Sequence, residues 1–339
     1  MADRLLGSFV WCELLTTDTA AAESFYKKVV GWTSAPFGPG GYIVFNNSAG
    51  SGVGGLMKLP DQAKQMGAPP HWLMYVGTPD VDGMAVRIAQ MGGRVHKQPD
   101  DIPSVGRFAV VQDPYGASFA IFNPKPAPGS PERKKGATGE FSWFELYTPN
   151  PEGAWKFYQT LFGWEKTSAM DMGEMGVYQM FGRGGGIPNG GIMKPPPGAP
   201  ASWMPYALVK DAKAAAANTA ANGGKIVNGP MEVPGGDWIA QGMDPQGAMF
   251  AVHSLKPAAE KAAPTSAKAS TKATADKSAG KPAKKAIAKK AKARKAKANK
   301  APKKKSAAKR AKARPVKKSA KKAKPTKKKA KKAAKRRKK

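Results

Sequence analysis

The segment Phe9-Val-Trp-Cys-Glu-Leu14 decides the fold, because it occurs a second time as Phe141-Ser-Trp-Phe-Glu-Leu146. Other motifs return in the same order: Phe25-Tyr26 as Phe157-Tyr158, Gly31-Trp32 as Gly163-Trp164, Gly54-Gly55 as Gly190-Gly191, Trp72 as Trp203, and Asp113-Pro-Tyr-Gly116 as Asp244-Pro-Gln-Gly247. Composition alone does not produce so many ordered matches at a nearly constant offset. Residues 1–256 are therefore predicted to be a tandem duplication.

Each copy has the pattern of a β-α-β-β-β unit that occurs twice. Asp18 and Asp80 can cap the two helices of the first copy, and Gly31 can end the first of these helices. Short apolar runs bounded by Gly, Pro and Asn predict the strands. In the first copy these strands are expected at residues 9–15, 42–45, 53–57, 72–76, 107–111 and 118–122.

This order of elements, together with the Phe-Tyr and Gly-Trp pairs and the terminal Asp-Pro-x-Gly hairpin, resembles the vicinal-oxygen-chelate superfamily of glyoxalases, bleomycin resistance proteins and dioxygenases. The resemblance covers residues 7–123 and 139–254 and is closest to the tandem subgroup often labelled glyoxalase or hydroxylase. It implies an α+β fold in which paired β-α-β-β-β modules form one open cup in each copy. We predict the following segments: domain 1 over residues 1–128, a linker over 129–138, domain 2 over 139–256 and a basic tail over 257–339.

Charge separates the tail from the two domains. Residues 257–339 hold 36 of the 57 Lys and Arg and only two acids, so the whole net charge of +34 lies there. This segment has no aromatic residue, resembles the tail of linker histone H1 in composition, and is expected to be disordered when free. The single cysteine, Cys12, and the lack of a long apolar stretch predict a cytoplasmic protein with no membrane span.

Cations at this density are expected to bind DNA or RNA through counterion release, without reading the base sequence. The tail is therefore predicted to associate the protein with the nucleoid. The residues expected to contact nucleic acid are Lys284, Lys285, Lys289, Lys290, Lys303, Lys304, Lys305, Lys327, Lys328, Lys329, Arg336 and Arg337.

Metal-dependent relatives hold a divalent ion with His, Glu or Gln side chains from four strands of the cup. By this resemblance the first ligand position is Trp11 in one copy and Trp143 in the other, and the last is Ala120 or Ala251. These side chains are not metal ligands, so we predict neither a metal nor a cofactor. The histidines are not repeated between the copies and are expected at surface or hairpin positions: His71, His96 and His253.

Both copies carry an acid in the first strand, Glu13 and Glu145. Because side chains alternate along a strand, each Glu shares a face with the Trp two positions before it, and that face is expected to line the cup. A carboxylate there would have a raised pKa and could act as a general base or hydrogen-bond acceptor, with a structural role as the alternative. Pocket residues are expected at six aromatic positions: Trp11, Trp143, Trp72, Tyr75, Trp203 and Tyr206. For Trp72, Tyr75, Trp203 and Tyr206, packing in the core is the alternative.

Three functions remain open from the sequence. The first is a metal-free protein that binds an unknown small molecule in one or both cups and nucleic acid through its tail. The second is an enzyme of the lyase, hydroxylase or dioxygenase type that uses Glu13 and Glu145 or an unrecognised metal site. The third is an architectural DNA-binding protein with folded heads. In each case the duplication can take the place of a homodimer.

We expect the full chain to bind duplex DNA with little sequence preference, and residues 1–256 alone not to bind. The logarithm of affinity should fall with the logarithm of salt concentration by roughly 0.9 per phosphate contacted, measured by fluorescence anisotropy. Scrambling the tail at fixed composition should change little, whereas glutamates that halve its charge should weaken binding strongly. Tight binding by residues 1–256, or a salt slope near zero, would place recognition in the folded domains.

Overall fold

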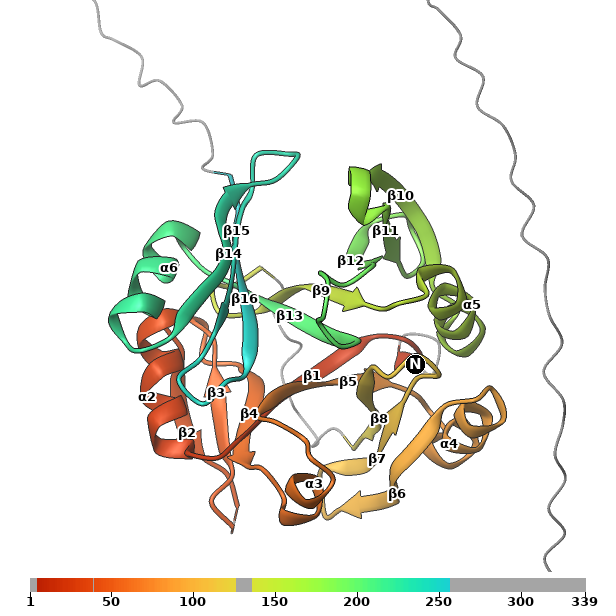
Figure 1. Ribbon diagram of the computed structural model, residues 1–339. Coiled ribbons are helices and arrows are strands. Elements are labelled where there is room, and N and C mark those ends of the chain that lie inside the picture. The colour runs from red at the N-terminus through yellow and green to blue at the C-terminus, as the bar shows by residue number, and fades with distance from the viewer. Residues whose placement is uncertain (1–4, 39, 126–135, 257–339) are drawn as a thin grey trace, which may run out of the picture. The chain divides into compact units, whose positions relative to one another are not determined.

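The computed structural model describes residues 5–38, 40–125 and 136–256 (Figure 1). These residues form two sheets of eight strands, with the matching orders β2-β3-β4-β1-β5-β8-β7-β6 and β10-β11-β12-β9-β13-β16-β15-β14. The predicted α+β fold of two tandem domains is therefore confirmed. The predictions for residues 257–339 fall outside the described part of the chain.

The first domain contains two consecutive modules, each with one longer helix between strands. Its elements are β1 (Phe9–Thr16), α2 (Thr19–Val29), β2 (Thr33–Pro36), β3 (Ile43–Asn46), β4 (Gly52–Lys58), α3 (Asp61–Gln65), β5 (His71–Gly77), α4 (Val81–Gln90), β6 (Arg94–Ile102), β7 (Gly106–Gln112) and β8 (Ser118–Pro124). The sequence patterns did not predict β2, β6 and α3, whose largely exposed residues show no apolar alternation.

The second domain repeats this order of strands and longer helices, with a 3₁₀ turn between β10 and β11 and no counterpart of α3 between β12 and β13. Its elements are β9 (Phe141–Tyr147), α5 (Pro151–Phe162), β10 (Glu165–Asp171), η1 (Gly173–Met175), β11 (Val177–Gly182), β12 (Pro188–Met193), β13 (Ser202–Leu208), α6 (Ala212–Ala221), β14 (Lys225–Glu232), β15 (Trp238–Met243) and β16 (Met249–Ser254). In the described residues, no helix is both long and apolar enough to cross a membrane.

The helices begin and end where their capping residues predict. The Asp18 carboxylate accepts the Ala21 backbone N–H at the start of α2, and the Asn150 side chain accepts the Gly153 N–H at the start of α5. Helix α5 ends at Gly163, whose φ of 66° lies in the left-handed region that a residue without Cβ adopts freely. Local sequence signals therefore set the length of both helices.

The first strand of each domain lies at the centre of its sheet. Strand β1 pairs in parallel with β4 and antiparallel with β5, and β5 pairs in parallel with β8. Strands β9, β12, β13 and β16 repeat this arrangement. The two modules of each domain therefore join along one antiparallel pair of strands, β1 with β5 or β9 with β13.

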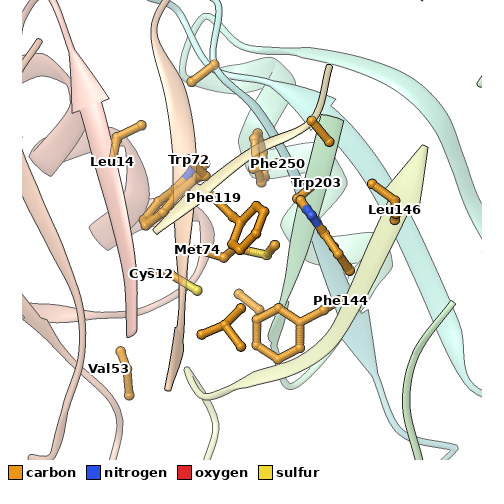
Figure 2. Close-up of a cluster of buried hydrophobic side chains, with 14 of the residues drawn as sticks. Cys12, Leu14, Val53, Trp72, Met74, Phe119, Phe144, Leu146, Trp203 and Phe250 are labelled. Carbon is orange, nitrogen blue, oxygen red and sulfur yellow. The ribbon is translucent and has the colours of Figure 1, made fainter. Parts of the chain in front are cut away.

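A continuous core joins the two domains. Figure 2 shows Trp72 and Met74 of the first domain packed in one cluster with Phe144 and Trp203 of the second. Phe9 adds a ring stacked on Phe144, with the ring centroids 3.8 Å apart. Helix α2 of the first domain packs against α6 of the second, as Figure 1 shows at one side, and α4 packs against α5 at the other.

The repeated Asp-Pro-x-Gly hairpin contributes to this interface. Asp113 Oδ1 accepts the backbone N–H groups of Tyr115 and Ala117, each at 2.9 Å, which fixes the turn. Its Oδ2 accepts the Tyr158 hydroxyl of the other domain at 3.0 Å, and that hydroxyl oxygen accepts the Trp203 indole N–H at 2.9 Å. Each Phe-Tyr helix motif therefore binds the final hairpin of the opposite copy.

Equivalent hydrogen bonds join the Phe-Tyr helix motif of the first domain to the final hairpin of the second. The Tyr26 hydroxyl donates to Asp244 Oδ2 at 3.1 Å and accepts the Trp72 indole N–H at 2.9 Å. The two tyrosines and two aspartates of these bonds are all buried, with at most 3% of each residue exposed. Because an unpaired buried polar group is costly, these bonds hold the domains in one relative position.

We expect Tyr158→Phe to lower the free energy of unfolding by about 1–3 kcal/mol, because it removes the hydrogen bonds that the Tyr158 hydroxyl forms with Asp113 Oδ2 and with the Trp203 indole N–H. Chemical denaturation with urea measures this change. Tyr115→Phe is the matched control, because that half-buried hydroxyl forms no hydrogen bond within the described residues. Equal destabilisation by the two substitutions would show that the interdomain bonds contribute little.

Candidate functional site

Strand alternation divides the side chains of β1 and β9 between the shared core and the cups. Cys12 and Leu14 point into the core between the domains. Trp11 and Glu13 lie on the other face, inside the cup of the first domain, where Glu13 pairs in register with Leu73 and Gly55. Glu145 has the same position in the second domain, between Gly191 and Met204 of the adjacent strands.

A glycine next to each glutamate makes room for a tyrosine that the sequence patterns did not identify. A Cβ on Gly55 would overlap the Tyr42 ring and hydroxyl, and a Cβ on Gly191 would overlap those of Tyr178. A tyrosine ring therefore approaches the backbone closely at each of these glycines. It brings a phenol beside each buried carboxylate.

Glu13 is 8% exposed and lies among phenols and an indole. The Tyr75 hydroxyl donates to Glu13 Oε2 at 2.9 Å, and the Trp11 indole N–H donates to the Tyr42 hydroxyl oxygen at 3.0 Å. Burial raises the pKa of Glu13, and the hydrogen bonds from Tyr75 and Tyr42 offset only part of this increase.

Glu145 has a larger polar network. The Tyr206 hydroxyl donates to Glu145 Oε2 at 2.7 Å, and the Gln241 amide donates to the same oxygen at 3.1 Å. Tyr147 and Tyr178 also form hydrogen bonds with the carboxylate. Burial raises the pKa of Glu145 despite these four partners, so the group takes up a proton more readily than an exposed glutamate.

The two cups differ most in what fills them. In the first domain the cup residues pack as a closed apolar cluster that includes Tyr75 and Phe122, and Ala63 of helix α3 packs against it. The matching cluster in the second domain contains only three buried residues. At the matched cup positions the first copy has Leu15, Leu73, Phe108, Val110 and Phe122, and the second has Tyr147, Met204, Ile239, Gln241 and His253.

The cup of the second domain opens into a cleft. This cleft reaches Glu145 but not Glu13. In the first domain it is lined by residues of the segment Pro60–His71 and by the cup residues Leu15, Leu73 and Val110, and its total volume is about 1680 Å³. Eight methionines of the second domain line it: Met170, Met172, Met175, Met180, Met193, Met204, Met231 and Met249. Flexible thioether side chains adapt to the shape of an apolar ligand and contact aromatic rings favourably.

The structure separates the predicted pocket residues into two groups. Trp11 and Tyr75 lie in the first cup, and Trp143 and Tyr206 lie beside Glu145 in the second. Trp72 and Trp203 border the cleft, but their indoles pack in the interdomain core and bond to Tyr26 and Tyr158, in agreement with the core-packing alternative. The cavity next to the first of them is only about 10 Å³, which holds at most one water molecule.

The donor atoms around the glutamates do not fit the divalent ion of metal-dependent relatives. At the matched ligand positions, the Trp143 indole N–H donates to the Tyr178 hydroxyl oxygen, and Ala251 has no donor atom. Glu145 is surrounded by phenols and an amide rather than by further carboxylates or imidazoles. In the described residues, no three His, Cys, Asp or Glu side chains gather closely enough to hold an ion. No chemical step proposed below uses a metal.

His253 lies in the β15–β16 hairpin, one of the positions expected for the unrepeated histidines. Its side chain is 15% exposed, and it faces the cleft from strand β16, opposite Ile239 of β15. Sequence reasoning also missed Tyr147 and Gln241, because both stand where the first copy has an apolar residue. A search for polar residues in only one copy would have found all three.

Each domain consists of two β-α-β-β-β modules joined along a central antiparallel strand pair, with a polar group at the floor of the cup. These features define a class of proteins in which paired modules form a cup. A model of the Glyoxalase/Bleomycin resistance protein/Dioxygenase superfamily matches residues 8–121 and again residues 140–252. The chain therefore belongs to this superfamily.

Comparisons with individual proteins agree with this membership. The chain is 34% identical over 256 residues to "Putative glyoxylase CFP32" of Mycobacterium tuberculosis, covering 74% of this chain and 95% of that protein. It is 30% identical over 265 residues to the anthracycline biosynthesis protein DnrV of Streptomyces peucetius, covering 74% and 94%. The Mn(II)-bound glyoxalase from Novosphingobium aromaticivorans shares the fold, with a TM-score of 0.53 at 17% identity over 74% of this chain and 84% of that one.

We expect Glu145→Gln to change the pH dependence of stability. The folded protein holds this proton above the ordinary glutamate pKa of 4.5, so the wild-type free energy of unfolding falls as pH rises from 4.5 through the raised pKa. The variant lacks this decrease. Relative to wild type the variant should therefore gain stability as the pH rises above 4.5 through the raised pKa, measured by urea unfolding at a series of pH values.

Glu232→Gln is the control, because Glu232 is an exposed glutamate on β14 of the same domain. It should leave the pH dependence unchanged. A Glu145→Gln variant that loses stability at the higher pH would show that the carboxylate form is preferred in the fold.

Proposed function

We propose that the second domain binds a small aromatic molecule in its cup, with Glu145 as the hydrogen-bonding group, while the first domain is a filled copy that supports it. One observation carries this proposal. The cleft reaches the buried carboxylate of Glu145, whereas the matching Glu13 does not line it. A pocket that is mostly apolar with a few convergent polar groups is typical of small-molecule sites.

The chemistry of the cup indicates what kind of ligand suits it. Methionines such as Met180 and Met204, together with Ile239, give the cleft adaptable apolar walls. Glu145 can accept a hydrogen bond from a ligand hydroxyl, and Gln241 can present its amide to a carbonyl. A flat aromatic molecule with phenol and carbonyl groups meets these conditions. The relative named for anthracycline biosynthesis supports the same ligand class.

The raised pKa of Glu145 supports an enzymatic form of the same proposal. A carboxylate whose pKa is closer to neutrality is a better proton acceptor than an ordinary glutamate, because general-base catalysis is most efficient when the pKa is near the working pH. A bound phenol or an acidic C–H could lose its proton to Glu145. In this form the protein is a proton-transfer enzyme of the superfamily rather than a binding protein.

We further propose that residues 257–339 bind DNA or RNA and hold the two domains at the nucleoid. The support is electrostatic: the tail carries the entire net charge of +34, and residues 1–256 have 21 basic and 21 acidic residues. Attraction to phosphate therefore comes from the tail. The tail would deliver the binding domains to nucleic acid without shaping the pocket.

Binding of a dihydroxyanthraquinone such as alizarin tests the small-molecule proposal. Titration of the full chain should quench tryptophan fluorescence, because Trp143 lies beside the cleft. Glu145→Gln should weaken binding by about tenfold, the loss expected for one hydrogen bond to a charged group. Isothermal titration calorimetry measures the same dissociation constants without a fluorescent reporter.

Glu13→Gln is the matched control, because it makes the same chemical change on the same strand of the filled copy. It should leave the dissociation constant unchanged. Equal weakening by both substitutions, or no effect of either, would contradict the assignment of the second cup as the binding site.

A further inference from the structure

A second polar cluster lies in the cleft of the second domain, formed by residues that the proposed ligand site does not use. The Ser142 hydroxyl lies 2.9 Å from Nδ1 of His253, and Nε2 of the same ring lies 3.1 Å from Asp237 Oδ2. All three residues line the cleft. A hydroxyl, an imidazole and a carboxylate bonded in series are the groups that activate a serine as a nucleophile.

Local strand geometry brings the three side chains together. The pairing of β9 with β13 shifts register between Trp143 and Phe141, so Ser142 is the extra residue of a β-bulge. Bulges redirect the side chain of the extra residue, and here the hydroxyl meets the histidine. His253 comes from β16, and Asp237 directly precedes β15, the strand that pairs with β16.

The hydrogen bonds determine which ring nitrogen is free to act as a base. Asp237 Oδ1 accepts the Lys256 backbone N–H at 2.8 Å. Burial acts to raise the pKa of Asp237, but this bond and the one from His253 outweigh it and hold the pKa below its usual range. The ionised carboxylate therefore keeps the imidazole proton on Nε2, which leaves the lone pair of Nδ1 directed at Ser142.

The first copy shows that the fold does not require these residues. The matched positions hold Val10, Gly106 and Phe122, which build the same strands without a polar cluster. Polar side chains in a partly buried site cost stability unless they are fully bonded. Their presence in the open copy alone, beside the cleft, points to chemistry there.

We propose that Ser142, His253 and Asp237 form a nucleophile, a general base and an orienting carboxylate that hydrolyse small aryl esters in the cleft. The Ser142 oxygen forms a bond to the ester carbonyl carbon while its proton moves to Nδ1 of His253. The bond to the aryl oxygen then breaks, and the phenol leaves with that proton. Water, deprotonated by the same nitrogen, attacks the acyl-serine and releases the carboxylic acid and free Ser142.

The apolar lining fits an aryl ester better than a charged one. Ile239 pairs with His253 across the two strands, and Met231 pairs with Ile239 from the neighbouring strand β14. An aromatic leaving group can pack against these side chains while its ester carbonyl faces Ser142. This proposal rests on residues other than Glu145 and is independent of the ligand site proposed above.

A fluorophosphonate probe tests the nucleophile in the full chain. It phosphonylates activated serines and discriminates against the many lysines of the tail, and peptide mass spectrometry locates the label. We expect the label on Ser142 and no label at this position in Ser142→Ala. His253→Phe, which restores the residue of the first copy, should slow labelling by about 100-fold, because removing a general base costs 10²–10⁴-fold.

Two further measurements make the test complete. Asp237→Asn, which keeps the shape of the side chain, should also slow labelling, and Ser168→Ala, an exposed serine outside the cleft, should not. Phenol release from phenyl acetate should be lost in Ser142→Ala. Thermal unfolding confirms that each variant is folded. If His253→Phe does not fold, His253→Gln takes its place. Absence of label on Ser142, or equal labelling rates with and without the histidine, would overturn the proposal.

Discussion

The reciprocal bonds between helix tyrosines and hairpin aspartates are the constraint on which the rest of the structure depends. Asp113 and Asp244 are almost fully buried at the interface, and each needs hydrogen bonds to its carboxylate to remain there. Two of these bonds come from backbone N–H groups of its own turn, and the third comes from Tyr158 or Tyr26 of the opposite copy. Neither copy therefore satisfies its own hairpin alone, which explains why both copies keep the same motifs.

This interface leaves the opposite face of each sheet free to change. Residues such as Leu14 and Leu146 remain alike, because both pack in the shared core. On the cup face, Leu15 corresponds to Tyr147 and Val110 to Gln241. In a duplicated protein, one copy can therefore stabilise the pair while the other holds an open cleft. Two identical subunits of a homodimer cannot divide these roles.

The second cup carries more buried and partly buried polar groups than the first. Glu145 remains buried because three phenols and Gln241 surround its carboxylate. Ser142 and His253 form a separate network farther along the same cleft, anchored by Asp237. Partly satisfied polar networks destabilise a fold. The second copy holds two nearly complete networks, and the first copy has no counterpart of the one that contains Ser142 and His253. This difference indicates a functional origin.

The sequence by itself determined the duplication, the order of elements, the helix caps and the position of Glu13 and Glu145 on the cup face. These follow from local signals: repeats, capping residues and strand alternation need no knowledge of distant contacts. Alternation could also have separated Trp72 from Tyr75, since residues three positions apart in a strand lie on opposite faces. Only the tertiary structure decided which cup is open, because that depends on the volumes of side chains from several strands and on α3. It also decided the contact of Ser142 with His253, since a bulge in β9 and residues 111 positions apart produce it.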